Sequence, residues 1–115
     1  MNEVTAPVVA NEEVVPGIHV VWVEAPTIAR AVQPGEFVMV RGWPRYDPPL
    51  RRALSVHRVA GPPGRAPQRL SVMVSAAGRG TGMMARAHPG DQWQMLGPLG
   101  KGFHIYPETR RLLLV

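Results

Sequence analysis

The sequence predicts a small all-β fold, an antiparallel barrel or sandwich of six short strands with one late helix. Thirteen prolines and twelve glycines are spread along the 115 residues, and they leave little room for long helices. The segments between them are rich in valine, which favours strands. Turn signals recur at nearly regular spacing, which is typical of small antiparallel folds. The length suits one domain with one core.

The predicted elements follow one another at short intervals, each bounded by turn-forming residues. The six strands are expected at Val8–Val15, Ile18–Ala25, Phe37–Arg41, Arg52–Val59, Arg69–Ala76 and Gln92–Leu96. The turns at 16–17 and 33–36 contain Pro-Gly pairs, which separate the first three strands. The helix is expected at Thr81–Ala87 and is ended by Pro89.

Charge and composition narrow the classes of function. The net charge is +5, and Lys101 is the only lysine, so the basic character rests on arginine. A basic surface suits nucleic acid, nucleotide phosphates or an acidic protein, although the arginine bias is equally consistent with genomic nucleotide composition. The chain has no cysteine, which excludes disulfides, thiolate metal sites and a cysteine nucleophile within it.

No segment has the pattern of a membrane span or a signal peptide. No apolar run approaches the ~20 residues that a membrane helix needs, and the N-terminus lacks a basic flank before an apolar stretch. We therefore expect a cytoplasmic protein that does not bind membranes. The final residues Leu112–Val115 are typical of the start of a buried parallel strand. We expect a longer protein to continue from them; the alternative is an edge strand that closes the barrel.

Three glycines and a threonine lie at the predicted start of the helix, in the stretch AGRGTGMMARAHPGD from Ala77 to Asp91. A helix N-terminus presents free N–H groups, and glycines let an anion approach the backbone. The Thr81 hydroxyl either contacts a phosphate or caps the helix. The spacing is neither that of a Walker loop nor that of a dinucleotide fingerprint. Alone, the stretch is consistent with a phosphate-binding loop or with an ordinary glycine-rich turn.

Two further motifs have a binding and a structural interpretation. In LRRALSV, Arg52 could hold a phosphate while Ser55 contacts a ring system along the strand; alternatively, the two arginines are a solvated pair. LGPLGKGF, from Leu96 to Phe103, contains three glycines and a proline. We expect it to be a sharply bent loop, either beside a binding cleft or in a linker.

The remaining aromatic and histidine residues predict no catalytic site. The four histidines lack the spacing of metal ligands, and no carboxylate pair stands out. We expect His57 to be exposed on its strand. We expect Trp22 and Trp93 in the core, and Trp43 exposed in a proline-rich loop.

The order of the motifs PGEFVMVR, LRRALSV, GRGT and LGPLGKGF, followed by an apolar strand, resembles the N-terminal FAD-binding domain of ferredoxin reductase-like proteins. In particular it resembles the electron-transfer subunit of bacterial dihydroorotate dehydrogenase, from about Val8 to Val115. The resemblance implies a six-stranded antiparallel Greek-key barrel with one short helix. It also implies an FAD-binding β-barrel domain at 1–103, followed at 104–115 by a linker and the first strand of a nicotinamide-binding domain.

The resemblance implies cofactor contacts on two strands and at the start of the helix. Arg52 would pair with the FAD pyrophosphate, residues 53–54 would lie along the flavin, and Ser55 would hydrogen-bond near its reactive edge. Residues 73–75 would contact the ribityl or adenosine side, and residues 80–81 the phosphates. The implied FAD-binding residues are Arg52, Ala53, Leu54, Ser55, Met73, Val74, Ser75, Gly80 and Thr81.

Two departures from the family pattern bear on affinity. Ala53 stands where a proline is usual, and Val74-Ser75 stands where a tyrosine–arginine pair is expected. An aromatic ring and a positive charge near the cofactor are thereby absent, and we expect weaker FAD binding.

The function that the resemblance implies is electron transfer from dihydroorotate oxidation, through FAD and a [2Fe-2S] cluster, to NAD. A catalytic dihydroorotate dehydrogenase-type subunit would be the partner. The NAD(P) domain and the cluster cysteines are not among these 115 residues, so the chain alone is not expected to turn over nicotinamide.

Two kinds of alternative remain open. Within the same class, the chain is the flavoprotein subunit of a sulfide dehydrogenase or of a ferredoxin–NADP oxidoreductase. In other classes, it is a structural module without a ligand or a basic barrel that binds single-stranded nucleic acid. We do not expect nucleic acid as a partner, because no strand interleaves aromatic and basic residues.

Overall fold

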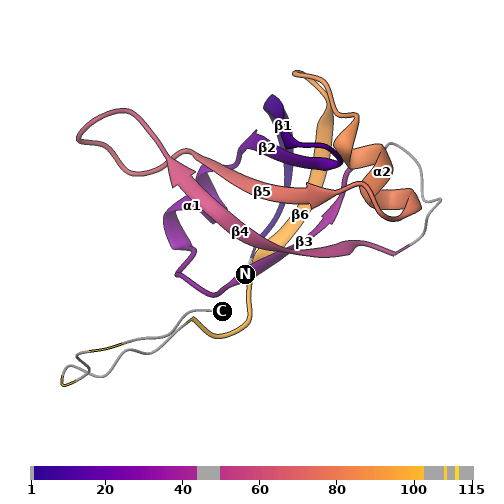
Figure 1. Ribbon diagram of the computed structural model, residues 1–115. Helices are drawn as coiled ribbons and strands as arrows, with labels where there is room; N and C mark the ends of the chain where they lie inside the picture. Colours follow the sequence, from indigo (N-terminus) through magenta and orange to yellow (C-terminus); the bar gives the residue numbers. More distant parts are fainter. Residues whose placement is uncertain (1, 44–49, 103–107, 109–110, 112–115) are drawn as a thin grey trace.

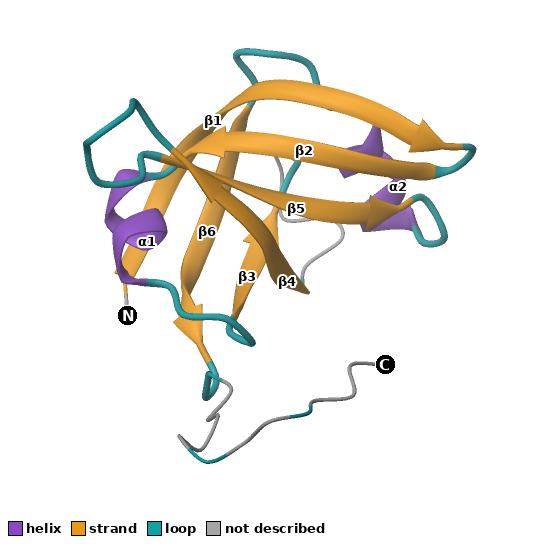
Figure 2. Cartoon of the chain, turned by 60° about the vertical axis from the view of Figure 1, so that its left-hand side comes forward, coloured by secondary structure: helices purple, strands orange, loops and turns teal. Residues whose placement is uncertain are grey.

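The computed structural model describes residues 2–43, 50–102, 108 and 111, which form a closed six-stranded antiparallel barrel (Figures 1 and 2). The strands are β1 (Asn2–Val15), β2 (Ile18–Glu24), β3 (Phe37–Arg41), β4 (Arg52–Ala60), β5 (Arg69–Ser75) and β6 (Gln92–Leu99). Their order around the barrel is β1-β2-β5-β4-β3-β6, and β6 pairs back to β1. The predicted barrel is confirmed, and the sandwich alternative was wrong.

Strand β1 is longer than predicted because it serves two neighbours. Its first half, from Asn2 to Pro7, pairs with β6, and its second half, from Val8 to Val15, pairs with β2. Pro7 lies where the strand changes partner, a position that tolerates the missing backbone N–H. The predicted start at Val8 was wrong, because the strand already begins at Asn2, where it pairs with β6.

The barrel carries two short helices rather than the single predicted one. Helices α1 (Pro26–Ala31) and α2 (Arg79–Ala85) lie at opposite ends of the barrel in both views (Figures 1 and 2). Proline at the first position favours the start of α1, which buries Ile28 and Ala29. Six residues are too few to show helical periodicity, so the sequence analysis missed α1. Among the described residues, no helix is long and apolar enough to cross a membrane.

Strand β6 continues through the segment that was predicted to bend. Gly97 pairs with Asn2, and Leu99 pairs with Phe37. A Cβ atom on Gly97 would lie 2.8 Å from Cγ1 of Val38, so a bare backbone is required where β6 passes β3. The expectation of a loop was therefore wrong for Leu96–Leu99, whereas residues 100–102 lie outside the strand and Gly100 has a positive φ of 85°. Phe103 lies outside the described residues.

The core fills the barrel with mostly aliphatic side chains and two tryptophan rings, Trp43 and Trp93. Trp93 is 1% exposed, as predicted, whereas Trp22 is only half-buried. Met84 reaches into the same cluster from α2, so this helix closes one end of the barrel. The largest fully buried side chains are Trp93, Ile28, Leu70, Met84, Met95, Val8, Val21, Val23, Val38, Val40, Val72 and Val74.

Replacing Ser71 with alanine is expected to stabilise the barrel. Ser71 is fully buried, and its Oγ has no hydrogen-bond partner within the described part of the chain. Because a buried hydroxyl without a partner costs about 1–3 kcal/mol, Ser71→Ala should raise the unfolding free energy by about 1 kcal/mol and Tm by about 4–8 °C. Thermal unfolding without cofactor measures this, with exposed Ser75→Ala as the control. A lower Tm for Ser71→Ala would contradict the assignment.

Candidate functional site

The two consecutive arginines at the start of β4, Arg51 and Arg52, have different surroundings. Arg51 forms an ion pair with Glu3 of β1, so its charge has a partner within the barrel. Arg52, the first residue of β4, donates from Nη1 to the carbonyl oxygen of Leu50 at 2.8 Å. Its guanidinium lies 5.7 Å from the centroid of the Trp43 ring, within the range of a cation–π contact. The two arginines are therefore not equivalent, and Arg52 is the one held beside a rigid ring.

Gly80 brings the first turn of α2 against this arginine and ring. A Cβ atom built on Gly80 would lie 2.8 and 2.9 Å from two carbons of the Trp43 ring and 3.1 Å from Nε of Arg52. Only glycine fits such a close approach without displacing a neighbour. The structure thus brings together two predicted site residues, Arg52 and Gly80, and adds the Trp43 ring, which lies against both.

Thr81 lies one turn into α2 rather than at its cap. The helix begins at Arg79 after Gly78, and the Gly78 N–H donates to the Thr81 hydroxyl oxygen at 3.0 Å. The hydroxyl thereby satisfies one of the N–H groups that a helix start leaves without a partner. The predicted helix start at Thr81 was wrong by two residues. The same hydroxyl donates to the Gly78 carbonyl oxygen at 3.4 Å, so it would have to turn away from this long bond to donate to an incoming anion.

The outer face of β4 presents small and polar side chains beside a surface cavity. Ala53, Ser55 and His57 are exposed, as the alternation predicted, while Leu54 and Val56 pack against the core. The cavity has a volume of about 350 Å³, and residues 53–57 of β4 and Met73 of β5 line it. Four of the predicted FAD-binding residues therefore share one hollow: Ala53, Leu54, Ser55 and Met73.

Val74 does not belong to this surface. Its side chain is fully buried, whereas Met73 is 45% exposed and Ser75 is also exposed. The predicted cofactor contact of a side chain at position 74 conflicts with this direction, because Val74 points into the barrel. An aromatic ring at position 74 would also point into the barrel, so its absence from this chain leaves the outer face of β5 unchanged.

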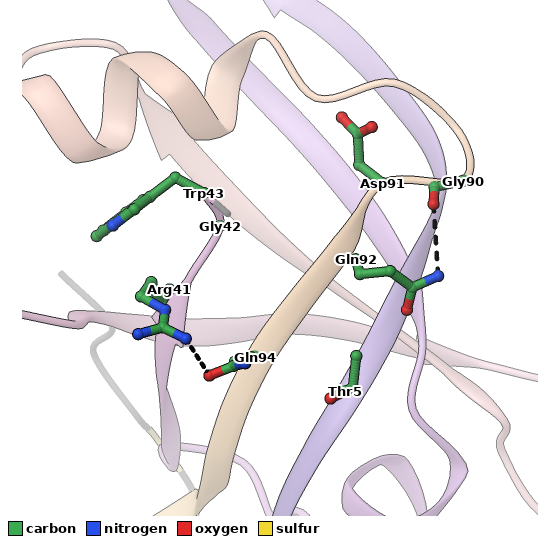
Figure 3. A pocket seen from close by; sticks show the side chains of 8 residues that line it. All are labelled: Thr5, Arg41, Gly42, Trp43, Gly90, Asp91, Gln92 and Gln94. Atoms are coloured by element: carbon green, nitrogen blue, oxygen red, sulfur yellow. Dashed lines mark hydrogen bonds between the residues drawn. The ribbon is translucent and has the colours of Figure 1, made fainter. Parts of the chain in front are cut away.

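Trp43 and its surroundings are the part of the site that the sequence analysis missed. The ring is 5% exposed, so the expectation that it is exposed was wrong. It also lines a second cavity of about 510 Å³, shown in Figure 3. The Arg41 side chain, 7% exposed, donates to the Gln94 amide oxygen at 2.5 Å in this cavity. Residues of β1, β3 and β6 and of the segments directly after β3 and before β6 line this cavity: Thr5, Arg41, Gly42, Trp43, Gly90, Asp91, Gln92 and Gln94.

Metal-ligating side chains do not cluster in the described ranges. No set of three or more histidine, aspartate or glutamate side chains that could hold a metal ion occurs among these residues. Around the predicted site residues the structure assembles the Arg52 guanidinium, the indole ring of Trp43, the Gly80 backbone and a shallow polar face of β4. Such an arrangement can bind an elongated anionic ligand whose ring system lies along β4.

Comparison with known proteins finds relatives of this chain in sequence and in fold. No protein-family model matches the chain. The chain is 41% identical over 100 residues to the electron transfer subunit of dihydroorotate dehydrogenase B (NAD(+)) from Desulforamulus reducens, covering 87% of this chain and 37% of that protein. The subunit of the same name from Geobacillus kaustophilus is 39% identical over 85 residues, 72% of this chain and 32% of that protein. The chain spans about a third of the length of these relatives.

Solved structures share the barrel. The NADH-dependent reduced ferredoxin–NADP oxidoreductase, described in work on flavin-based electron bifurcation, superposes with a TM-score of 0.68 at 22% identity, over 86% of this chain and 34% of that one. The cytochrome b5 reductase domain of Ulva prolifera nitrate reductase gives a TM-score of 0.65 at 10% identity, over 86% and 40% of the two chains. The chain is therefore similar in sequence to the electron transfer subunits of dihydroorotate dehydrogenase B over about a third of their length, and it shares its barrel fold with these two solved structures.

Proposed function

We propose that this chain is the FAD-binding barrel of an electron-transfer oxidoreductase subunit. The observation that carries the proposal is the position of Arg52, which is held between Trp43 and the Gly80 backbone at the end of the hollowed face of β4. A guanidinium forms strong charge-assisted bonds with phosphate oxygens. Ser55 and Met73, which share the hollow, are suited to contact a ring system that lies along the strand.

Each part of the site has a separate binding role. Arg52 would pair with the FAD pyrophosphate, and the close approach at Gly80 would let phosphates reach the α2 backbone, with Thr81 donating its hydroxyl. Ala53 and the backbone of Leu54 would lie along the flavin, and Ser55 would hydrogen-bond to its edge. The bound flavin would supply the transfer of electrons between donors and acceptors. The protein would orient it and set its surroundings.

The complete protein would connect this barrel to further redox partners. Following its relatives' name, we propose that it passes electrons from dihydroorotate oxidation in a catalytic partner subunit to NAD(P). The barrel would occupy residues 1–103. The proposed linker and strand at 104–115, and a nicotinamide domain after them, fall almost entirely outside the described residues. Since this chain contains no cysteine, a [2Fe-2S] cluster would be ligated elsewhere in the complete protein.

A second candidate role lies in the same class. The fold likeness to the ferredoxin–NADP oxidoreductase structure favours a flavoprotein subunit of that kind, or of a sulfide dehydrogenase, as the alternative. Both roles require FAD on the barrel. The two roles differ in the electron donor. To identify it, the complete protein with its partner subunit would be mixed with dihydroorotate or with reduced ferredoxin, and reduction of the bound FAD would be measured.

Titration of FAD with the purified chain tests the proposal. The expected result is quenching of flavin fluorescence and a shift of the visible absorption bands, saturating at one FAD per chain. Absence of both at tens of micromolar protein would contradict FAD binding. Salt-sensitive binding of a single-stranded oligonucleotide together with that absence would favour the nucleic-acid alternative.

A further inference from the structure

A side chain of β1 holds the C-terminal end of α2. Nδ2 of Asn11 donates to the carbonyl oxygens of Ala85 at 3.0 Å and of Ala87 at 2.9 Å. Ala85 is the last residue of α2, and carbonyls at a helix end lack partners within the helix. Asn11 is separated from them by more than seventy residues, so this is a tertiary contact that ties the helix to the β1–β2 hairpin.

His19 of β2 fixes the orientation of the Asn11 amide. Both amide hydrogens of Asn11 point at carbonyl oxygens, so the amide atom that faces His19 is Oδ1. An amide oxygen can only accept a hydrogen bond. Nδ1 of His19 lies 2.8 Å from this Oδ1 and must therefore carry the hydrogen. The other ring nitrogen, Nε2, lies 3.3 Å from a carboxylate oxygen of Glu13. The contact with His19 thus keeps the Asn11 amide in the orientation in which both of its hydrogens point at carbonyl oxygens in and just beyond the C-terminal end of α2.

The far end of the same helix contacts the residues that we propose to bind phosphate. Helix α2 has seven residues, and a helix of this length depends on tertiary contacts for its stability. Its C-terminal turn is held by Asn11, and its first turn places Gly80 against Trp43 and Arg52. A tilt of this short rigid element at one end therefore moves Gly80 relative to Arg52 at the other.

We propose that Asn11, oriented by His19, is a positioning residue that sets the place of α2 against Arg52 and thereby the affinity for the phosphates of the cofactor. The inference rests on the proposed function, because it assigns to Arg52 the phosphate contact. Asn11 does not touch the cofactor in this account. It acts through the helix, and its effect is confined to the phosphate-bearing part of the ligand.

Comparing the affinity for FAD with the affinity for riboflavin distinguishes a positioning role of Asn11 from a general loss of structure. Asn11→Asp keeps the shape and the acceptor for His19 but removes both donors to the helix. FAD affinity of the 115-residue chain should fall roughly tenfold, as expected for lost hydrogen bonds, while riboflavin, which lacks phosphates, should bind unchanged. Hydrogen exchange of the α2 amides should accelerate relative to the strands. Exposed Glu12→Gln on the same strand is the control, and His19→Ala should give a weaker effect in the same direction.

The outcomes distinguish this inference from the proposed function. Unchanged FAD affinity in folded Asn11→Asp, an equal loss for both flavins, or unchanged exchange in α2 would each overturn the positioning role. If Asn11→Asp does not fold, the same readings on His19→Ala decide. If the unmodified chain does not bind FAD, the proposed function fails, and exchange of the α2 amides alone decides whether Asn11 positions the helix.

Discussion

Replacing Arg52 with glutamine is expected to weaken FAD binding by roughly 10- to 100-fold, the loss that follows from removing charge-assisted hydrogen bonds of about 1.5–3 kcal/mol. The guanidinium is held over the Trp43 ring beside Gly80, so it needs little reorganisation to bind a phosphate. The FAD affinity of Arg52→Lys should lie between those of Arg52→Gln and of the natural protein, because lysine keeps the positive charge but lacks the planar guanidinium. Fluorescence titration with FAD measures all three proteins.

The neighbouring arginine provides a matched control. Arg51→Gln removes the same charge one residue away, but the Arg51 side chain pairs with Glu3 rather than lying beside Gly80. An exposed pair of this kind contributes about 1 kcal/mol or less to stability. We expect FAD affinity to change less than threefold. Equal losses for Arg51→Gln and Arg52→Gln would mean that only the general positive charge attracts FAD, and would contradict a specific phosphate contact.

Replacing Gly80 with alanine is expected to lower FAD affinity roughly tenfold or more, because the new methyl group displaces Arg52 and its phosphate bonds. The added Cβ would lie 2.8 Å from the Trp43 ring and 3.1 Å from Nε of Arg52. Overpacking costs about 1–3 kcal/mol, while alanine in a helix gains about 1 kcal/mol over glycine, so the net change in stability should be small or moderately unfavourable. FAD titration and thermal unfolding of the same samples separate the two effects.

Gly82 lies in the same helix and is the matched control for Gly80. A Cβ atom there would meet only Nη1 of Arg86, at 3.8 Å, which is an ordinary contact. Gly82→Ala should therefore raise the unfolding free energy by about 0.5–1 kcal/mol and leave FAD affinity unchanged. A Gly80→Ala protein that binds FAD as tightly as Gly82→Ala would remove the close approach at Gly80 from the account of the site.

The strands could be predicted because their signals are local. Valine-rich segments and the intervening Gly and Pro residues predict four of the six strands, β2 to β5, to within one residue at both ends, and the face of β4 follows from simple alternation. The same alternation along β5, with Leu70, Val72 and Val74 buried, indicates that Val74 faces the core. A cofactor contact at Val74 would therefore have to come from its backbone, and it stays a prediction.

The contacts that complete the site could not be predicted, because they join distant parts of the chain. Trp43 follows β3, and its burial depends on Gly80 of α2 and Arg52 of β4. Asn11 looks like a polar interruption in a strand, and only the folded hairpin shows that it reaches the end of α2. No pattern in the sequence near either residue indicates these partners. Composition and spacing report local structure, whereas a site assembled across a barrel needs the three-dimensional registry of its strands.

The most direct test of the central claim is the map of backbone amide chemical shifts of the 115-residue chain during titration with FAD. If FAD binds at the proposed site, the largest chemical-shift changes should fall on Arg52, Ser55, Met73 and Gly80, which lie around the hollow of β4 and the first turn of α2. Shifts concentrated instead on Thr5, Asp91 and Gln94, around the cavity of Figure 3, would contradict this placement of the cofactor. Absence of shifts anywhere would contradict FAD binding itself.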